Sequence, residues 1–403
     1  MEILDCLRDK QQWQLFYEYK LSCNNLPDWM LKQLREYIDN QRYLPVANRI
    51  DAGLGFSHPK KSAISKMHSE KKRIVYTYPQ EENWALKFIT YLLLRRYDHL
   101  FSPNLYSFRA NTGVAHAIRD LTRIRGVGKM YSYKVDIRNY FNSIPIERLL
   151  PMVESVLSGE PRLYRFIEGL LTDPIVMDNG KEITEEKGIM AGTPVSTFLA
   201  NLYLADMDAM FFREKNPYAR YSDDIILFAP TEAELEASVQ RIRTILAEAG
   251  LEINPAKESR TAPGEKWVFL GVSYQNGIID VAPASVEKIK AKMRRKTRAL
   301  HRWADRKKLP GDRAAKAFIR VFNKKLFQAE SEHDLTWARW FFPLINTAES
   351  LHAIDLYAQS CIRYLATGKH TKAAYNFRYE DMKALGYVSL VNAYWHHRDE
   401  NPD

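Results

Sequence analysis

The chain has 403 residues, of which 46% are hydrophobic and 27% are charged. This composition supports a substantial core, predicts two or three packed subdomains and excludes the fibrous, collagen-like and disordered classes. The three cysteines are not spaced for a zinc site or a disulfide framework. Because the chain has no secretory signal and no apolar run long enough for a bilayer, we expect a cytoplasmic protein with no membrane contact.

The positive charge is concentrated in one segment. The net charge is +10, but residues 288–325 hold sixteen Lys or Arg against Asp305 and Asp312, a balance of +14, which leaves −4 for the rest. A long basic run of one sign is typical of a surface that binds phosphate backbones. A solvated helix face is the alternative explanation for the same run.

In chain order, the basic residues 61–73 lead into a β-rich segment that Pro79 ends. Residues 81–101 have apolar spacing that predicts a buried helix. Residues 129–137 alternate as a strand does, with Asp136 at its end. We expect a buried helix over 196–212 and two short strands around a tight turn over 219–229.

The following segment carries clear helix boundaries. Thr231 and Glu234 form a capping-box pattern, and Gly250 is a typical residue to follow the last turn. Further strands are predicted at 251–253 and 267–274, and mostly helical structure from Ser285 onward. The order strand, helix, hairpin, helix, strand predicts an α+β core with the split βαβ layout.

Three aspartates stand where this layout brings strand ends together. Asp136 ends one strand, and Asp223 and Asp224 occupy the predicted hairpin turn. Carboxylates presented from neighbouring strands can hold two divalent ions, which is the arrangement that phosphoryl transfer by a polymerase requires. A solvated acidic turn would show the same Tyr-x-Asp-Asp string, so the string by itself is weak support.

The surrounding residues supply the stronger signal, because seven segments resemble the motifs of the reverse transcriptase family in the family's order. The segments are Lys71–Pro79, Tyr106–Arg109, Val135–Phe141, Gly188–Leu204, Tyr221–Asp224, Gly250–Lys257 and Phe269–Val272. The resemblance runs from about Lys71 to Val272. It implies a right-hand polymerase with fingers, a ferredoxin-like (split βαβ) palm and a helical thumb.

The resemblance also implies the roles of the residues near the metal ions. Asp136 and Asp223 would be the main ligands of two Mg²⁺ ions, with Mn²⁺ as the alternative metal. Asp224 would support the site, and the carbonyl group of Ile137 would also face the ions. Lys257 would protonate the departing pyrophosphate, or it is an ordinary surface lysine.

Other residues are expected to bind the nucleotide. Lys71 and Arg73 would hold its phosphates. Phe141 falls where the family places an aromatic barrier against the ribose 2′-hydroxyl, which favours deoxynucleotides. Gly192 would allow close approach of the backbone. Ala191 departs from the family, because most members carry a glutamine there that touches the nucleotide.

Template and product are expected to lie against basic residues. The predicted nucleic-acid contacts are Arg109, Lys292, Arg295, Lys296 and Arg298. Aromatic residues interleave with the basic ones in this stretch and suit a nucleic-acid duplex or a structured RNA. The expected domains are the N-terminal region and fingers over 1–128, the palm over 129–284 with an insertion around 150–190, and a thumb and tail over 285–403.

Within the family, the Ala-Gly-Thr-Pro form at 191–194 and the segments Tyr97–Arg109 and Leu385–Trp395 most resemble the bacterial "unknown group", or defence-associated, enzymes. This implies RNA-templated DNA synthesis in antiphage defence, with a non-coding RNA as template and dNTPs as substrates. A homo-oligomer and an accessory defence protein are both compatible with it.

Three other functions remain open. Ala191 is compatible with an untemplated or protein-primed DNA polymerase. A retron or group II intron-like enzyme is a more distant resemblance. The last alternative is a non-catalytic RNA-binding scaffold, against which the three intact aspartates argue.

Overall fold

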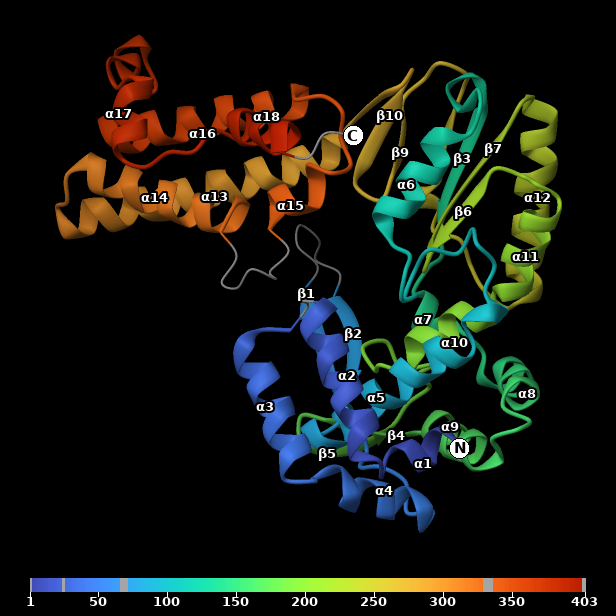
Figure 1. Cartoon of the computed structure of the whole chain (residues 1–403). Coiled ribbons are helices and arrows are strands. Elements are labelled where there is room, and N and C mark those ends of the chain that lie inside the picture. The colour runs from blue at the N-terminus through green and yellow to red at the C-terminus, as the bar shows by residue number, and fades with distance from the viewer. Residues whose placement is uncertain (1, 24–25, 66–71, 329–335, 401–403) are drawn as a thin grey trace. The chain divides into compact units, whose positions relative to one another are not determined.

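The chain forms two compact units, Met1–Pro263 (unit 1) and Gly264–Asp403 (unit 2), in a computed structural model (Figure 1). The structure describes residues 2–23, 26–65, 72–328 and 336–400. Among the described residues, no helix combines the length and the apolar character needed to cross a bilayer.

Unit 1 contains two sheets and most of the shorter helices. Its α-helices are α1 (Ile3–Cys6), α2 (Lys10–Cys23), α3 (Asp28–Asp39), α4 (Tyr43–Asp51), α5 (Gln80–Arg96), α6 (Val114–Arg123), α7 (Tyr140–Ser143), α8 (Ile146–Val156), α9 (Pro161–Thr172), α10 (Ser196–Tyr203), α11 (Ala205–Arg213) and α12 (Glu232–Glu248). Its strands are β1 (Lys60–Ser65), β2 (Lys72–Thr77), β3 (Tyr131–Asp136), β4 (Ile175–Asp178), β5 (Lys181–Thr184), β6 (Tyr218–Tyr221), β7 (Asp224–Ala229) and β8 (Ser259–Thr261).

The sheet that carries the predicted palm has the order β6-β7-β3-β8, and all its pairs are antiparallel. This is the strand order of a ferredoxin-like sheet, so the predicted split βαβ layout is confirmed. Helix α12 packs against β3 and β7 (Figure 1). The predicted capping box is present, since Thr231 Oγ1 accepts a hydrogen bond from the Glu234 amide.

Two details of the predicted palm were wrong. The fourth strand is β8, whereas residues 251–253 contribute only a bridge between Ile253 and Ile137. The single helix expected over 196–212 is two helices, α10 and α11. The break lies at Leu204, whose φ of −115° and ψ of 17° are outside the helical range.

A second sheet in unit 1 has the order β2-β1-β4-β5. Strands β1 and β2 are antiparallel neighbours in sequence, but β4 joins β1 in parallel, with Lys60 opposite Met177. The predicted insertion around 150–190 therefore completes the sheet that the N-terminal region begins. The strand predicted before Pro79 and the helix after it are confirmed as β2 and α5.

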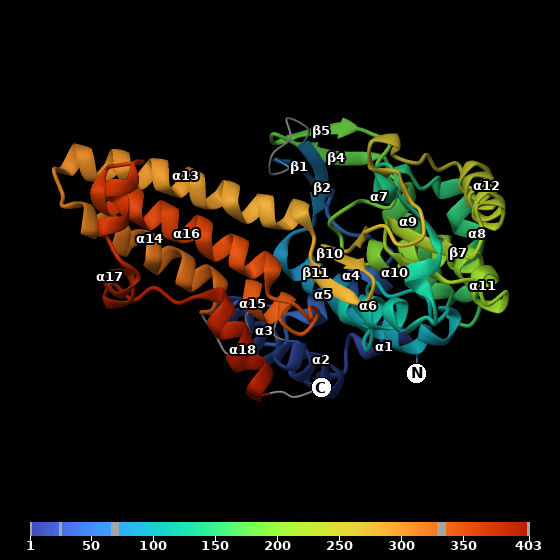
Figure 2. The same cartoon turned by 90° about the horizontal axis from the view of Figure 1, so that it is seen from above.

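Unit 2 begins with three short strands and continues as a helical bundle. Its elements are β9 (Trp267–Phe269), β10 (Val272–Gln275), β11 (Ile278–Val281), α13 (Pro283–Lys307), α14 (Gly311–Leu326), α15 (Trp337–Phe341), α16 (Glu349–Thr367), α17 (Tyr379–Ala384) and α18 (Leu390–Glu400). Leu270 and Gly271 both have positive φ (49° and 84°) and form the tight turn between β9 and β10. Helices α13, α14 and α16 run side by side (Figure 2).

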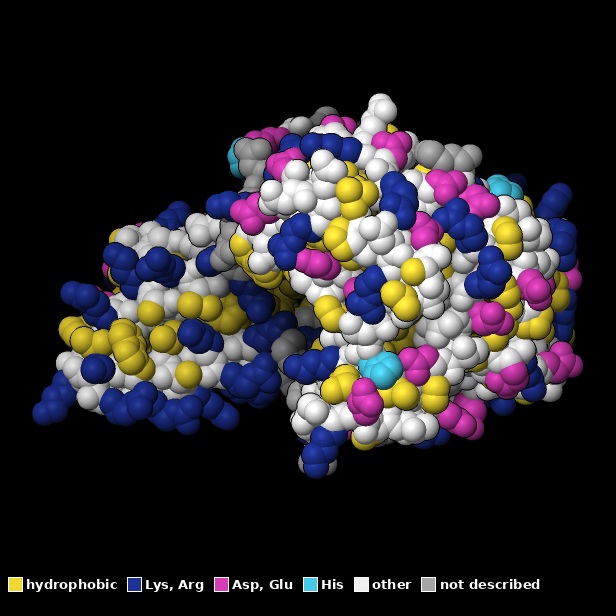
Figure 3. Space-filling view, turned by 90° about the horizontal axis from the view of Figure 1, so that it is seen from below, with side chains coloured by type: hydrophobic (Ala, Val, Ile, Leu, Met, Phe, Trp, Pro, Cys, Tyr) yellow, Lys and Arg dark blue, Asp and Glu magenta, His cyan; other side chains and the backbone are white. Residues whose placement is uncertain are grey.

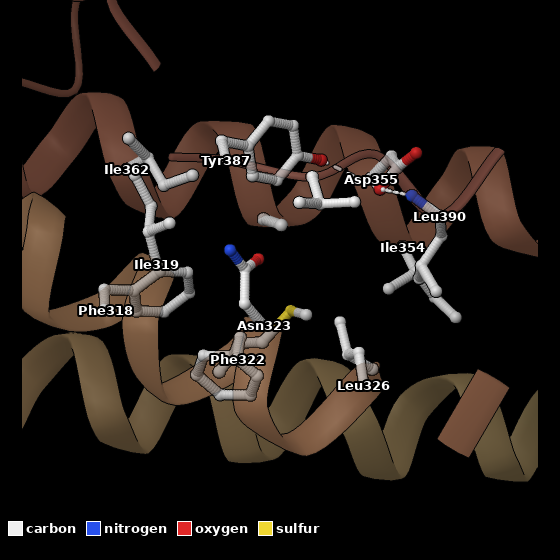
Figure 4. Close-up of a pocket in the computed structure, with 13 residues that line it drawn as sticks. Phe318, Ile319, Phe322, Asn323, Leu326, Ile354, Asp355, Ile362, Tyr387 and Leu390 are labelled. Atoms are coloured by element: carbon white, nitrogen blue, oxygen red, sulfur yellow. Dashed lines mark hydrogen bonds between the residues drawn. The ribbon is translucent and has the colours of Figure 1, made fainter. Parts of the chain in front are cut away.

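A small apolar pocket marks where the C-terminal segment packs on this bundle, as Figure 4 shows. Its free volume is about 10 Å³, which is room for one water molecule. Beside it the buried carboxylate of Asp355 accepts hydrogen bonds from the Tyr387 hydroxyl (2.8 Å), the Ser389 hydroxyl (2.6 Å) and the Leu390 amide (2.9 Å). Asp355 thereby holds the start of α18 against α16.

Candidate active site

The structure brings the three predicted aspartates to one end of the β6-β7-β3-β8 sheet. Asp136 is the last residue of β3, and its register partner across the sheet is Asp224, the first residue of β7. Asp223 lies in the turn between β6 and β7. The backbone amide of Ile137 donates a hydrogen bond to the carbonyl oxygen of Asp223 (3.0 Å), so the strand end and the turn are fixed to each other.

The carboxylates of Asp136, Asp223 and Asp224 are close enough to influence one another electrostatically, and burial partly removes them from water. Asp136 is 3% exposed. Burial raises the pKa of Asp223 to about 6, and the neighbouring charges of Asp136 and Asp224 add to the rise. Burial also raises the pKa of Asp224, against the opposing effect of the Lys134 ammonium group.

Two residues after α12 reach the same carboxylate. The ammonium group of Lys257 forms an ion pair with Asp136 Oδ2, and Asn254 Nδ2 donates to Asp136 Oδ1 (3.3 Å). The Asn254 amide also donates to the Asp136 carbonyl oxygen (2.7 Å). The structure thus brings Lys257 into the site. Asn254 was missed as a site residue, although it lies in the motif-like segment that ends at Lys257.

The donor set fits divalent ions that a substrate helps to hold. Among the residues that the structure describes, no three Asp, Glu, His or Cys side chains are arranged to hold a metal ion by themselves, without ligands from a substrate or water. Mg²⁺ is commonly held by one or two carboxylates together with substrate phosphates and water. Asp136, Asp223 and Asp224 offer hard oxygen ligands, and a cation bound between them would offset the repulsion that Asp136 and Asp224 exert on the Asp223 carboxylate.

A buried ion pair between β6 and α11 stabilises the β6–β7 hairpin that carries Asp223 and Asp224. Arg220 and Asp208 have fully buried side chains, and their closest N–O distance is 2.5 Å. The Arg220 guanidinium also donates to the carbonyl oxygens of Asn201 (3.1 Å) and Ser222 (3.3 Å). Sequence reasoning missed both charged residues, because nothing in their spacing shows that α11 lies beneath β6.

The loop before α10 packs closely on its neighbours. The Ala191 carbonyl accepts from the Tyr76 amide of β2 (2.8 Å), and the Ala191 amide donates to Asn142 Oδ1 (2.9 Å). Gly192 has a φ of +100°, and a Cβ there would stand 3.1 Å from the Tyr76 carbonyl oxygen. Gly192 therefore packs closely against β2, and the approach to a nucleotide expected of it stays a prediction.

Phe141, the predicted barrier to ribose, lies beyond the end of β3 and is half-buried. Its ring meets the ring of Phe108 at 6.1 Å between centroids, with 80° between the planes. Gly188 packs against the backbone behind it, because a Cβ on Gly188 would stand 2.6 Å from the Phe141 carbonyl oxygen.

The predicted phosphate-binding and fingers residues have different surroundings. Lys71 lies outside the described residues. Arg73 is exposed on β2, opposite Ile64 of β1. The Arg109 guanidinium makes two hydrogen bonds to Asp98 (2.7 and 2.9 Å) and two more to backbone carbonyl groups. Most of its donors are thus used inside the fold, and the nucleic-acid contact predicted for Arg109 stays a prediction.

The basic segment of unit 2 forms a charged surface on α13 and α14. The residues of α13 that face the bundle are Val286, Ile289, Met293, Thr297, Leu300 and Ala304. Arg295 and Arg298 are exposed, and Lys292 and Lys296 are half-buried. Burial and the nearby charge of Lys325 lower the pKa of Lys292. Figure 3 shows the Lys and Arg side chains gathered over this helical part, where an anion would relieve their repulsion.

Comparisons with known proteins agree with the geometry of unit 1. Residues 59–274, just over half of the chain, match the family described as reverse transcriptase (RNA-dependent DNA polymerase). A retrovirus-related Pol polyprotein from the type-1 retrotransposable element R2 of Nasonia vitripennis is 29% identical over 164 residues. That alignment spans 36% of this chain and 15% of the polyprotein.

Solved structures of yeast telomerases are also similar at low identity. Apo telomerase from Candida tropicalis is 12% identical with a TM-score of 0.48, over 82% of this chain and 69% of that one. Telomerase from Candida albicans in complex with a fragment of telomeric RNA is 13% identical with a TM-score of 0.45, over 82% and 64% of the two chains. Similarity at this level says nothing about function. On the family match and the arrangement of its α+β palm, the chain belongs to the reverse transcriptase family.

Proposed function

We propose that the chain is an RNA-directed DNA polymerase that joins deoxynucleotides by two-metal nucleotidyl transfer. The observation that carries the proposal is the placement of Asp136 beside Asp223 and Asp224 at adjacent strand ends. The proposal goes beyond the family match, because the chain spans only 15% of the curated relative it matches.

The residues of the site divide the chemistry among them. Asp136, Asp223 and Asp224, with the carbonyl group of Ile137, would hold two Mg²⁺ ions, or Mn²⁺ in their place. Such ions, when bound, would stabilise charge on the attacking 3′-oxygen and on the departing pyrophosphate. Lys257 stands beside Asp136, within the site, and we assign it the proton for the pyrophosphate.

The substrates would also contact residues outside the metal site. Arg73 and Lys71 would bind the triphosphate, Phe141 would exclude the 2′-hydroxyl, and the loop at Ala191 and Gly192 would border the nucleotide. Lys292, Arg295, Lys296 and Arg298 would bind the phosphates of an RNA template and its DNA product.

We assign residues 1–128 to the N-terminal region and fingers, 129–284 to the palm and 285–403 to the thumb and tail. The pairing of β4 with β1 supports a fingers insertion around 150–190. The β9–β10 hairpin belongs to unit 2, together with the proposed thumb helices. We nevertheless assign it to the palm, because Phe269–Val272 resembles a palm motif of the family.

We further propose that the enzyme acts in the bacterial cytoplasm in antiphage defence and copies a structured non-coding RNA. The support is the resemblance of residues 191–194, Tyr97–Arg109 and Leu385–Trp395 to defence-associated enzymes. A second copy of the chain or an accessory defence protein would be a partner in that role.

A second candidate function is untemplated or protein-primed DNA synthesis. Its support is Ala191, which offers a methyl group where most of the family offers a glutamine amide. The backbone groups of Ala191 are already hydrogen-bonded to Tyr76 and Asn142.

Sequencing the nucleic acid made in cells by the wild type and by the Asp223→Ala/Asp224→Ala variant tests the proposal. We expect DNA only in the wild type, mapping to one RNA encoded near the gene. Homopolymeric DNA would favour the second candidate. Product that persists in the variant would overturn the polymerase assignment, and RNA binding without any product would favour a non-catalytic scaffold.

A further inference from the structure

Phe108 has a backbone conformation that bulky residues rarely adopt. Its φ is +59°, in the left-handed region where glycine, asparagine and aspartate are common and where a phenylalanine costs free energy. Such strain persists only where surrounding contacts determine the conformation, and it is most frequent at functional sites.

The contacts of the two neighbouring residues supply that constraint. Ser107 is fully buried; its hydroxyl donates to Asn201 Oδ1 (3.0 Å) and accepts from the Ser222 amide (2.9 Å). The Ser107 carbonyl accepts from Asn201 Nδ2 (2.8 Å). On the other side, the Arg109 guanidinium is held by both carboxylate oxygens of Asp98. The backbone at Phe108 is thus fixed from both ends.

The strained backbone directs the Phe108 ring toward two residues of the site. Its ring centroid lies 6.1 Å from that of Phe141 in an edge-to-face arrangement, and 6.4 Å from that of Tyr221, which begins the Tyr-x-Asp-Asp turn. Edge-to-face packing is a favourable geometry for aromatic rings. The Phe108 side chain is only half-buried, so filling the core does not explain why a ring is placed there.

We propose that Phe108 is a specificity-determining residue that holds the ring of Phe141 in the position where it excludes a ribose 2′-hydroxyl. This inference rests on the proposed DNA polymerase function. A purely structural role would lower stability and the kcat/KM for dNTPs. The proposed role predicts instead that loss of the Phe108 ring raises the kcat/KM for rNTPs relative to that for dNTPs.

The full-length protein is assayed for single-nucleotide incorporation on a primed RNA template, with dNTPs and rNTPs separately. The readout is the ratio of kcat/KM for dNTP to kcat/KM for rNTP. Phe108→Asn removes the ring but suits a left-handed backbone, so it separates the loss of the ring from misfolding. Phe108→Tyr keeps the ring. Phe211→Leu is the control for damage to the palm, because Phe211 is fully buried against Tyr218.

We expect Phe108→Asn to lower the ratio by about three- to tenfold, the range that corresponds to one aromatic pair. Phe108→Tyr should retain most of it, and Phe211→Leu should lower stability without changing the ratio. Phe141→Ala should lower the ratio further, and adding Phe108→Asn to it should have no additional effect.

The two hypotheses fail differently. An unchanged ratio in Phe108→Asn, in a background where Phe141→Ala lowers the ratio, would overturn the role of Phe108 and leave the polymerase function intact. An unchanged ratio in Phe141→Ala, or a wild type without preference for dNTPs, would also overturn the role proposed for Phe108. Absence of any dNTP incorporation that depends on Asp223 would overturn the proposed function itself.

Discussion

The amide of Ile137 donates a hydrogen bond of 3.0 Å to the carbonyl oxygen of Asp223. This contact joins the end of β3 to the turn after β6, two segments about ninety residues apart in sequence. Together with the register that sets Asp136 opposite Asp224, it fixes the separation of the carboxylates through the backbone. Side-chain changes at the aspartates should therefore leave the geometry of the strand ends intact.

Replacing Asp223 by asparagine should abolish nucleotidyl transfer and leave the fold in place. A drop of at least about 10²-fold is expected, because ligands of catalytic metals support several kcal/mol of transition-state stabilisation. Measured without divalent ions, thermal stability should be unchanged or higher, since the variant removes one charge from a crowded cluster. Asp206→Asn, on the exposed side of α11, is the matched control and should keep full activity.

Breaking the buried pair beneath the hairpin should cost far more stability than breaking a surface pair. Arg220→Met leaves Asp208 buried and uncompensated, which costs about 3–5 kcal/mol of unfolding free energy. Arg241→Met breaks the half-exposed pair with Glu214 and should cost at most about 1 kcal/mol. Urea unfolding measures both. A double Asp208→Leu/Arg220→Met variant should recover part of the loss, and equal costs for the two single arginine variants would contradict the expectation.

Gly188→Ala should lower both stability and activity for two reasons: the backbone strain of a positive φ, and a steric clash of the new Cβ. Its Cβ would stand 2.6 Å from the Phe141 carbonyl oxygen. Gly180 also has a positive φ (+81°), but nothing lies within 4 Å of a Cβ there, so Gly180→Ala isolates the strain of about 1–2 kcal/mol. Thermal unfolding and the rate of dNTP incorporation should both fall more for Gly188→Ala. Similar losses in the two variants would mean that the contact with Phe141 is unimportant.

The basic surface of unit 2 should bind RNA in a salt-dependent way. Changing Lys292, Arg295, Lys296 and Arg298 together to glutamine should weaken binding and reduce the slope of log Kd against log salt by up to about 3. Fluorescence anisotropy with a labelled RNA at several salt concentrations measures the slope.

A control variant removes the same number of charges from exposed positions of unit 1. Its substitutions are Lys10→Gln, Lys32→Gln, Lys181→Gln and Lys215→Gln. It should change the slope much less. Equal slopes in the wild type and in the α13 variant would show that phosphates are bound elsewhere.

Features of the sequence with a strict local cause were predicted well. The capping box at Thr231 and the glycine after α12 fix that helix by neighbouring backbone groups, and the alternation before Asp136 fixes β3. The order of these local patterns along the chain (strand, helix, hairpin, helix, strand) then predicted the ferredoxin-like sheet, and with it the position of the three aspartates at one end of that sheet. The roles of Lys257, Phe141 and the residues on α13 remain predictions.

Features that depend on distant partners were not predicted. The break at Leu204 has no proline or glycine to mark it, so the apolar run there is continuous. The fourth strand is β8 because Ser132, Tyr133 and Lys134 pair with it across the sheet, which local composition does not show. The ion pair of Arg220 was not predicted, since only the packing of α11 against β6 brings Asp208 to it.

The parallel pairing of β1 with β4 also constrains how the protein can form. The two strands are separated by more than a hundred residues, and that stretch includes β3 with Asp136. During synthesis, the edge of β1 that faces β4 has no partner until residues 175–184 have left the ribosome. An N-terminal fragment that stops before β4 would expose that edge, so such fragments should aggregate, and a cut within the intervening segment should be tolerated only if both pieces are made together.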